Sequence, residues 1–189
     1  TQVDVFTDEL MFGNPVAVVH DAPELTSQQM ADFASWTNLS ETTFLSAPTD
    51  EQADYQIRIF TPNTELPFAG HPTLGSAHAW LEAGGVAQDS NMIIQQCAAG
   101  LVRIRRDGNR LAFAAPPLIR GGDVASEDLS EIMAFLGVNH DQVVAAQWAD
   151  NGPGWVALLL SDAETVLALR PRAADAGRFS AVGVIGSYP

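Results

Sequence analysis

The sequence predicts an α+β fold, in which many short strands surround a small number of helices. Runs rich in β-branched and aromatic residues, several with period-two alternation, recur along the chain. Other runs carry helix signals, namely capping boxes at the start and glycine or asparagine at the end. Apolar residues make up 47% of the 189 residues, so the chain can bury a sizeable core.

The first part of the chain is predicted to hold most of the strands and two helices. A capping box of Thr26 and Gln29 starts the first helix, and Asn38 ends it. The second helix runs from about Pro72 to Ala83, because proline suits the first helical position and Gly84-Gly85 closes the helix. The expected strands are Val3–Thr7, Pro15–His20, Glu41–Ser46, Asp54–Pro62, Asn91–Cys97, Leu101–Arg106 and Arg110–Ala115.

The remaining residues repeat this pattern in a shorter form. A boundary is expected at Pro116-Pro117 and Gly121-Gly122, followed by a helix at Glu127–Leu136. A last helix opens at Ser161, with Glu164 completing a second capping box. The expected strands are Val143–Trp148, Trp155–Leu160 and Ala181–Gly186. This part has few strands with which to surround a helix, and its length of about 70 residues is small for a domain.

Composition excludes several classes of function. The net charge is −14, and an acidic surface repels phosphate backbones, so we expect no nucleic-acid partner. Every basic residue is arginine, which removes a Schiff-base lysine and the lysine of a phosphate-binding loop. No run is long enough to span a bilayer, and no signal peptide is visible. The single cysteine, Cys97, fits a reducing compartment, so we expect a cytoplasmic protein without a membrane partner.

His71 stands between Gly70 and Pro72, where the second helix begins. The first turn of a helix presents unpaired N–H groups and the positive end of the helix dipole, which together favour anions. On this interpretation the amides of His71, Thr73 and Leu74 bind a carboxylate, and Gly70 lets the ligand approach the backbone. The alternative is a buried histidine that is hydrogen-bonded to the backbone at an ordinary helix start.

Glu41 lies where the first helix leads into a strand, between the apolar residues Leu39 and Phe44. A partly desolvated glutamate has a raised pKa and is suited to move protons. The alternative, and the commoner one for such a stretch, is a solvated glutamate at a strand edge. Ser40 can hydrogen-bond the carboxylate or cap the turn, and Asn14 can line a ligand pocket or make a turn.

The remaining candidates are weaker. His78 follows His71 by two helical turns, which is not the spacing of a helical metal pair, and His20 and His140 lie elsewhere, so no metal site is expected. No Gly-x-Gly-x-x-Gly signature precedes a helix, so a nucleotide cofactor has no support. Cys97 lies in a predicted strand and is expected to be a core residue and not a nucleophile.

The stretches "VDVFT…FGNPVAVV", "NLSETTFL", "YQIRIFTPNTELPFAGHPTLGSAHAWL" and "GLVRIRRDG" together resemble the N-terminal half of the PhzF-like phenazine biosynthesis family. The resemblance implies a diaminopimelate-epimerase-like fold, with two pseudo-symmetric domains that each wrap a curved sheet around a central helix. It places an N-terminal domain at residues 1–118 and part of a C-terminal domain at residues 119–189. The active site is implied to lie between the domains.

The resemblance also implies a function. It makes Glu41 the principal acid/base, with His71 and Gly70 beside it. Thr73, Asn14 and Ser40 are expected as further substrate-binding residues from their places in the sequence. The implied protein is a cofactor-independent isomerase or epimerase that acts on a small carboxylated metabolite, and members of the family commonly form homodimers. A catalytically silent binding or scaffold protein on the same fold is the alternative.

One family motif is missing from the sequence. The second domain of the family carries an aspartate-proline pair followed by threonine-glycine-serine, and no Asp-Pro pair occurs in these 189 residues. We therefore expect an incomplete two-domain protein. A complementing C-terminal segment outside this chain would then supply a second acidic residue.

Overall fold

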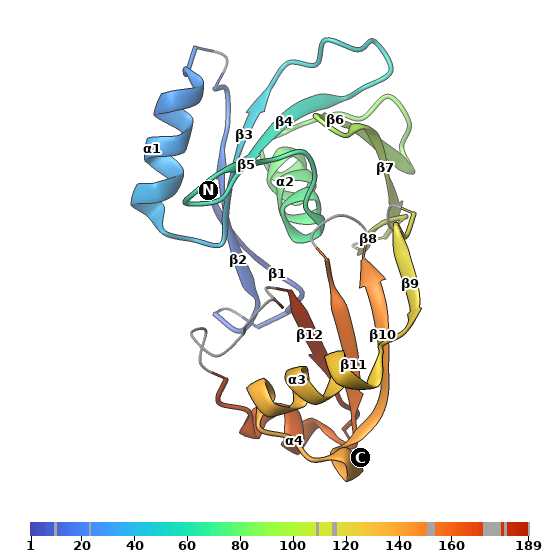
Figure 1. Ribbon diagram of the computed structural model, residues 1–189. Helices are drawn as coiled ribbons and strands as arrows, with labels where there is room; N and C mark the ends of the chain where they lie inside the picture. The colour runs from blue at the N-terminus through green and yellow to red at the C-terminus, as the bar shows by residue number, and fades with distance from the viewer. Residues whose placement is uncertain are drawn as a thin grey trace. The chain divides into compact units, whose positions relative to one another are not determined.

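The computed structural model describes residues 1–9, 11–22, 24–108, 110–114, 117–150, 154–171, 179 and 181–188. The chain divides into two compact units, Thr1–Ala115 and Pro116–Pro189. Each unit has its own sheet (Figure 1). Each unit also has its own apolar core. The predicted α+β fold class is confirmed in the described residues.

The first unit consists of a curved sheet around one helix, with a second helix outside it (Figure 1). Among the described residues its sheet has eight strands, in the order β1-β2-β3-β4-β6-β7-β8, with β5 paired to β4. The elements are β1 (Gln2–Val5), β2 (Asn14–Val19), α1 (Ser27–Thr37), β3 (Glu41–Ser46), β4 (Tyr55–Phe60), β5 (Glu65–Leu66), α2 (Gly70–Glu82), β6 (Met92–Cys97), β7 (Gly100–Asp107) and β8 (Arg110–Phe113).

Strand β3 separates the two helices, and its alternation decides which side chain faces which helix. Leu45 belongs to the core that packs against α2, whereas Phe44 belongs to the cluster under α1. Because successive side chains in a strand point to opposite faces, Glu41 shares the α2 face with Thr43 and Leu45. The sequence alternation therefore directs the Glu41 carboxylate toward the central helix.

The first helix has the ends that its sequence predicts. The Thr26 hydroxyl oxygen accepts a hydrogen bond from the Gln29 backbone N–H, and Gln29 Oε1 accepts one from the Thr26 backbone N–H, which completes the capping box. Asn38 ends the helix in the left-handed conformation, with φ 53°.

Helix α2 begins at Gly70, two residues before the predicted start at Pro72. Proline therefore occupies the third helical position and not the first. It is tolerated there because the N–H groups of the whole first turn have no partner within the helix. This shift changes which backbone amides are free for a ligand, since Thr73 now stands one full turn into the helix.

Gly75 allows α2 to lie directly against the sheet. A Cβ atom added at Gly75 would come within 2.5 Å of a Val16 methyl carbon and 3.0 Å of one on Val5. Overpacking of this kind costs about 1–3 kcal/mol, which exceeds the helix-propensity gain of about 1 kcal/mol from glycine to alanine. Gly75 is thus set by packing and not by helix propensity.

Because a 2.5 Å contact is a severe overlap, we take the upper end of the overpacking cost, about 3 kcal/mol, less the propensity gain of about 1 kcal/mol, and expect Gly75→Ala to destabilise the first unit by about 2 kcal/mol. The measurement is denaturant unfolding followed by circular dichroism. His78→Ala, an exposed position on the same helix, is the control and should leave the midpoint nearly unchanged. A Gly75→Ala protein as stable as the control would show that α2 can move away from β2 at no cost.

The second unit contains a smaller sheet in the order β12-β11-β10-β9, in which β11 and β12 are parallel. Its core joins Ile132 and Leu136 of the longer helix to Val156 and Leu158 of β11. The elements are β9 (Arg120–Asp123), α3 (Ser126–Leu136), a 3-10 turn (His140–Gln142), β10 (Val143–Asp150), β11 (Val156–Leu160), α4 (Ala163–Ala168) and β12 (Val182–Ile185).

Two predictions for this unit need correction. Gly121 and Gly122 do not form a boundary loop but lie in β9, where Gly122 pairs with Trp148. Gly122 has a φ of 89°, and a Cβ atom added there would meet no other atom within 4 Å. The last helix is capped by Asp162 and not by Ser161, because the Asp162 carboxylate accepts the Thr165 N–H at 2.6 Å. Of the other predicted boundary pair, Pro116 lies outside the described residues.

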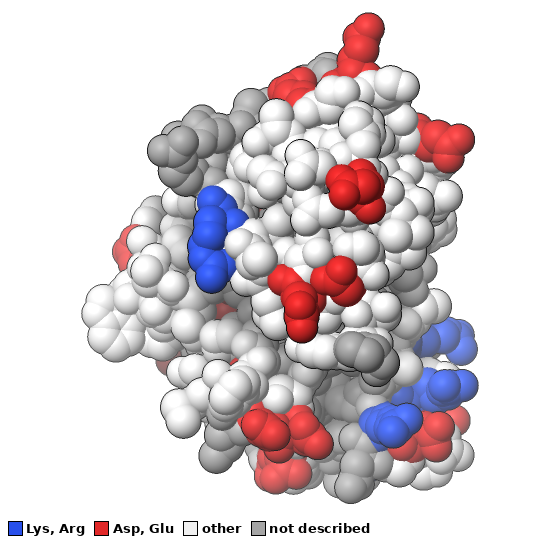
Figure 2. Space-filling model, turned by 90° about the horizontal axis from the view of Figure 1, so that it is seen from below, with Lys and Arg blue, Asp and Glu red and all other residues white. Residues whose placement is uncertain are grey.

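Acidic side chains are spread over the face of the molecule shown in Figure 2, with arginines gathered in a few places. This distribution accords with the net charge of −14. Within the part of the chain that the structure describes, no helix is long and apolar enough to cross a membrane.

Candidate active site

Glu41 and His71 meet where β3 and α2 both begin. Strand β2 runs parallel to β3, with Val16 opposite Glu41, and Gly75 packs on Val16. His71 stands one helical turn before Gly75 and so lies on the same face of α2. This arrangement brings His71 Nε2 to 3.3 Å from Glu41 Oε2.

The Glu41 and His71 side chains are largely buried, but no regular hydrogen bond joins them. The side chains of His71 and Glu41 are 9% and 17% exposed. Both facing atoms, His71 Nε2 and Glu41 Oε2, are buried without a hydrogen-bond partner in the structure. Buried polar atoms are normally hydrogen-bonded, and a catalytic role is one of the explanations for an exception. The pair therefore marks a candidate active site.

Burial lowers the pKa of His71 below its usual value, although the neighbouring Glu41 and the Pro15 carbonyl act in the opposite direction. Desolvation disfavours the charged imidazolium and outweighs the attraction of the carboxylate. The helix N-terminus beside the ring also disfavours a positive charge. His71 is accordingly neutral near pH 7, so the imidazole can accept or donate a hydrogen bond.

Asn14 and Ser40 flank the pair at the ends of neighbouring strands. Ser40 Oγ donates to Asn14 Oδ1 at 3.3 Å, and both residues are exposed. The β2–β3 register places them next to Glu41, since Asn14 begins β2 and Ser40 immediately precedes β3. The structure thus gathers Asn14, Ser40, Glu41 and His71 in one place.

The N-terminus of α2 provides backbone donors at the same point. Ala69 is the N-cap residue and makes no side-chain cap, and Pro72 has no N–H. The N–H groups of Gly70 and His71 have no acceptor within the described parts of the chain. A Cβ atom at Gly70 would come within 3.1 Å of the Phe113 ring, so glycine also fits the limited space here.

Thr73 lies beneath this site and not in it. Its side chain is fully buried, and its N–H and hydroxyl both donate to the Ala69 carbonyl, at 3.2 and 2.9 Å. Thr73 was predicted to face the ligand because the helix was predicted to start at Pro72, two residues after its actual start at Gly70. With the helix beginning at Gly70, the Thr73 amide is already used within the helix.

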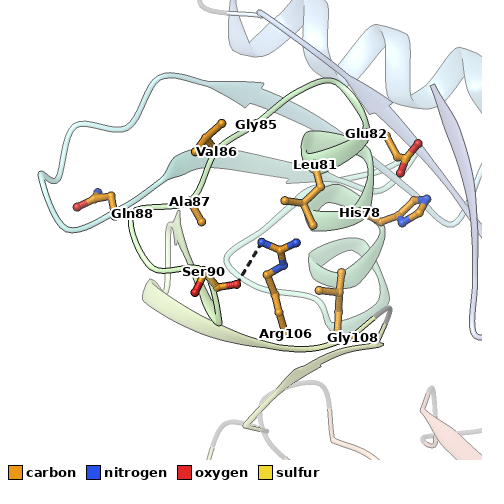
Figure 3. Close-up of a pocket in the computed structure, with 11 residues that line it drawn as sticks. His78, Leu81, Glu82, Gly85, Val86, Ala87, Gln88, Ser90, Arg106 and Gly108 are labelled. Carbon is orange, nitrogen blue, oxygen red and sulfur yellow. Dashed lines mark hydrogen bonds between the residues drawn. The ribbon is translucent and has the colours of Figure 1, made fainter.

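A separate cavity of about 860 Å³ opens at the other end of α2. Figure 3 shows that its walls include His78 and Glu82 from α2 and Arg106 from β7. Arg106 donates to the Ser90 carbonyl at 3.3 Å, and none of the predicted site residues lines the cavity. The Glu41–His71 pair is the stronger candidate site, because it combines burial, contact and unpaired polar atoms.

Among the residues that the structure describes, no group of three His, Cys, Asp or Glu side chains is placed to hold a metal ion. Gln95 is a polar core residue that the sequence pattern was not used to predict. It lies in the buried phase of β6 with Ile93 and Cys97, and the alternation of "MIIQQC" could have revealed it.

Residues 3–188 match the model of the PhzC-PhzF family, described as phenazine biosynthesis-like protein. The chain therefore belongs to this family, as its motifs predict. A solved relative, a phenazine biosynthesis protein of the PhzF family from Enterococcus faecalis, superposes with a TM-score of 0.76 at 26% identity. It covers 97% of this chain, which spans 66% of that structure.

Curated relatives extend the comparison. The chain is 42% identical over 181 residues to antisense-enhancing sequence 1 of Schizosaccharomyces pombe, covering 90% of this chain and 60% of that protein. It is 36% identical over 172 residues to trans-2,3-dihydro-3-hydroxyanthranilate isomerase of Pseudomonas aeruginosa, covering 89% of this chain and 59% of that enzyme. The chain thus spans about 60% of the length of these relatives.

Proposed function

We propose that this chain carries the principal acid/base of a cofactor-independent isomerase or epimerase acting on a small carboxylated metabolite. The observation that supports the proposal most directly is the buried contact between Glu41 and the neutral His71 at the start of α2. The isomerase among the curated relatives supports the same class of reaction.

In this reaction Glu41 takes a proton from a carbon near the substrate carboxylate. A C–H bond breaks, an O–H bond forms on Glu41, and the electron pair is delocalised toward the substrate carboxylate. Return of the proton to a different carbon gives isomerisation, and return to the opposite face of the same carbon gives epimerisation. Neither outcome changes the oxidation state, so the reaction needs no redox cofactor.

The start of α2 would hold the substrate. The free N–H groups of Gly70 and His71 are suited to a carboxylate, because they lie at the positive end of the helix dipole. Negative charge that develops on the substrate is stabilised by the same donors and by the His71 ring. Asn14 and Ser40, exposed beside the pair, would contact the polar groups of the substrate that lie farther from the reacting carbon.

The proposal includes partners outside this chain. The curated relatives are longer than the matched region, which leaves room for a complementing C-terminal segment that supplies a second acidic group. We further propose a homodimer located in the cytoplasm, where the single free thiol, Cys97, would remain reduced.

The test is an isotope experiment on the whole gene product. The protein is incubated in D2O with trans-2,3-dihydro-3-hydroxyanthranilate, the substrate in the name of the bacterial relative, and followed by NMR and mass spectrometry. We expect deuterium from the solvent in the substrate or the product, because a carboxyl group that carries the proton exchanges with water. The Glu41→Gln protein should incorporate deuterium at least ~100-fold more slowly.

The same experiment distinguishes an isomerase from a catalytically silent binding protein. A panel of small α-hydroxy, α-amino and cyclic carboxylates extends the test to other substrates. Binding of a carboxylate, measured by calorimetry, without any deuterium incorporation across the panel would contradict the isomerase and favour a binding protein on this fold.

A further inference from the structure

A line of buried polar groups runs through the first unit from the sheet to the start of α2. The Tyr55 hydroxyl donates to Gln95 Oε1 at 2.9 Å, and Gln95 Nε2 donates to Thr73 Oγ1 at 3.0 Å. The Thr73 hydroxyl then donates to the Ala69 carbonyl at 2.9 Å. Each side-chain group in this Tyr55–Gln95–Thr73 chain is the donor of the next bond, so the chain has one direction and ends at Ala69.

The chain lies in the core, where a polar group is costly unless it is fully bonded. Gln95 and Thr73 are 0% exposed and Tyr55 is 2% exposed. Burial raises the pKa of Tyr55 well above its usual value, so the hydroxyl stays protonated and remains a donor. An apolar side chain at position 95 would continue the pattern of Ile93 without this cost. The polar chain therefore calls for a reason other than packing.

That reason lies in the way α2 starts. Its N-cap residue is Ala69, which has no side chain with which to cap the helix. The Ala69 carbonyl instead accepts both the N–H and the hydroxyl of Thr73, so the first turn is fixed from inside the core. Gly70 and His71 follow Ala69 directly. Their N–H groups stay free because the anchor uses the carbonyl of the N-cap residue and none of these amides.

We propose that Tyr55, Gln95 and Thr73 are positioning residues, which hold the first turn of α2 so that His71 and the Gly70 and His71 amides face Glu41 and the substrate. The inference rests on the function proposed above. Thr73 and Gln95 are fully buried, so they act through Ala69 and not by touching the substrate. A displacement of about 1 Å of a catalytic group can lower the rate about 100-fold, which gives such an anchor a measurable effect.

Thr73→Val and Thr73→Ser test the anchor at its last bond. Valine keeps the branched shape and removes the hydroxyl, whereas serine keeps the hydroxyl and removes the methyl group. We expect Thr73→Val to lower kcat about tenfold or more, because displaced catalytic groups no longer hold the geometry that the transition state needs. Thr73→Ser should retain kcat within about threefold, although it leaves a small cavity.

The His71 titration provides a readout that does not depend on the substrate. NMR of the imidazole, assigned with a His71→Asn protein, reports its pKa. In the Thr73→Val protein the first turn can loosen and expose the ring, so the His71 pKa should rise toward the usual value of about 6.5. In the Thr73→Ser protein the His71 pKa should match that of the unchanged protein.

Thr43→Val is the matched control. Thr43 is also fully buried and shares a 2.8 Å hydrogen bond with Ser76, farther along α2. Its removal costs a buried hydrogen bond of the same kind without touching the Ala69 anchor. We expect a comparable loss of stability, with the His71 pKa and kcat little changed. If Thr73→Val does not fold, Tyr55→Phe removes the first donor of the chain and should move the His71 pKa in the same direction by a smaller amount.

The outcomes separate this inference from the proposed function. An unchanged His71 pKa in Thr73→Val, or equal changes in Thr73→Val and Thr43→Val, would overturn the positioning role whatever the activity. Full activity in Glu41→Gln would instead overturn the proposed function, and the NMR comparison would still decide whether the chain positions His71.

Discussion

Replacing Glu41 with glutamine is expected to lower kcat at least ~100-fold, the scale of a lost general acid/base. Glutamine has nearly the same size and can stay beside His71, but it cannot take a proton from carbon. KM should change much less, because the amides of Gly70 and His71 that bind the carboxylate remain in place. Steady-state kinetics on a substrate that shows deuterium exchange provides the measurement.

Glu82→Gln is the control for this variant. Glu82 ends the same helix and lines the cavity at its far end, away from the Glu41–His71 pair. It removes one negative charge from the first unit as well, so any general effect of net charge appears in both proteins. Equal activities of the two variants, with Glu41→Gln at the level of the unchanged protein, would rule out Glu41 as the acid/base.

Replacing His71 with asparagine is expected to lower kcat about 100-fold. Asparagine keeps a polar group at the helix start but loses the ring that reaches Glu41 at 3.3 Å. Removing one preorganised donor from a site of developing charge costs about 10²–10³ in kcat in well-studied enzymes. The rate of deuterium exchange, measured together with kcat, shows whether the loss lies in the proton transfer itself.

His78→Asn makes the same substitution two turns along the same helix. His78 is exposed and lines the separate cavity, so its replacement should leave kcat unchanged. The assignment of His71 would fail if both histidine variants kept full activity. It would also fail if both lost activity together, since a general loosening of α2 would then explain the result.

The sequence predicts elements well where one local signal decides them. Strand β3 has the predicted bounds of Glu41–Ser46, and α1 has the predicted capping box and the predicted end at Asn38. The meander β6-β7-β8 also follows the predicted order, since alternating strands and short turns specify neighbours in sequence. Strand β5 has two residues and is too short to show any period, and β9 (Arg120–Asp123) is fully exposed and has no apolar residue, so neither strand was predicted.

The site is only partly visible in the sequence for a physical reason. Glu41 and His71 are 30 positions apart, and their contact depends on the β2–β3 register and on the close approach of α2 at Gly75. The local sequence pattern specifies neither the register nor this approach, so only the resemblance to a family predicted that Glu41 and His71 act together. The role of Thr73 was missed for a related reason, because a two-residue error in the helix start exchanges a free amide for a bonded one.

The buried Cys97 allows local opening of the first unit to be measured by thiol labelling. It is the one cysteine of the chain, lies at the end of β6 and is 7% exposed, and burial raises the pKa of its thiol. A disulfide reagent can reach it only when this end of the sheet opens, and the reactive thiolate is scarce until then. The ratio of its labelling rate to that of a free thiol therefore gives the free energy of that local opening without any probe added to the protein.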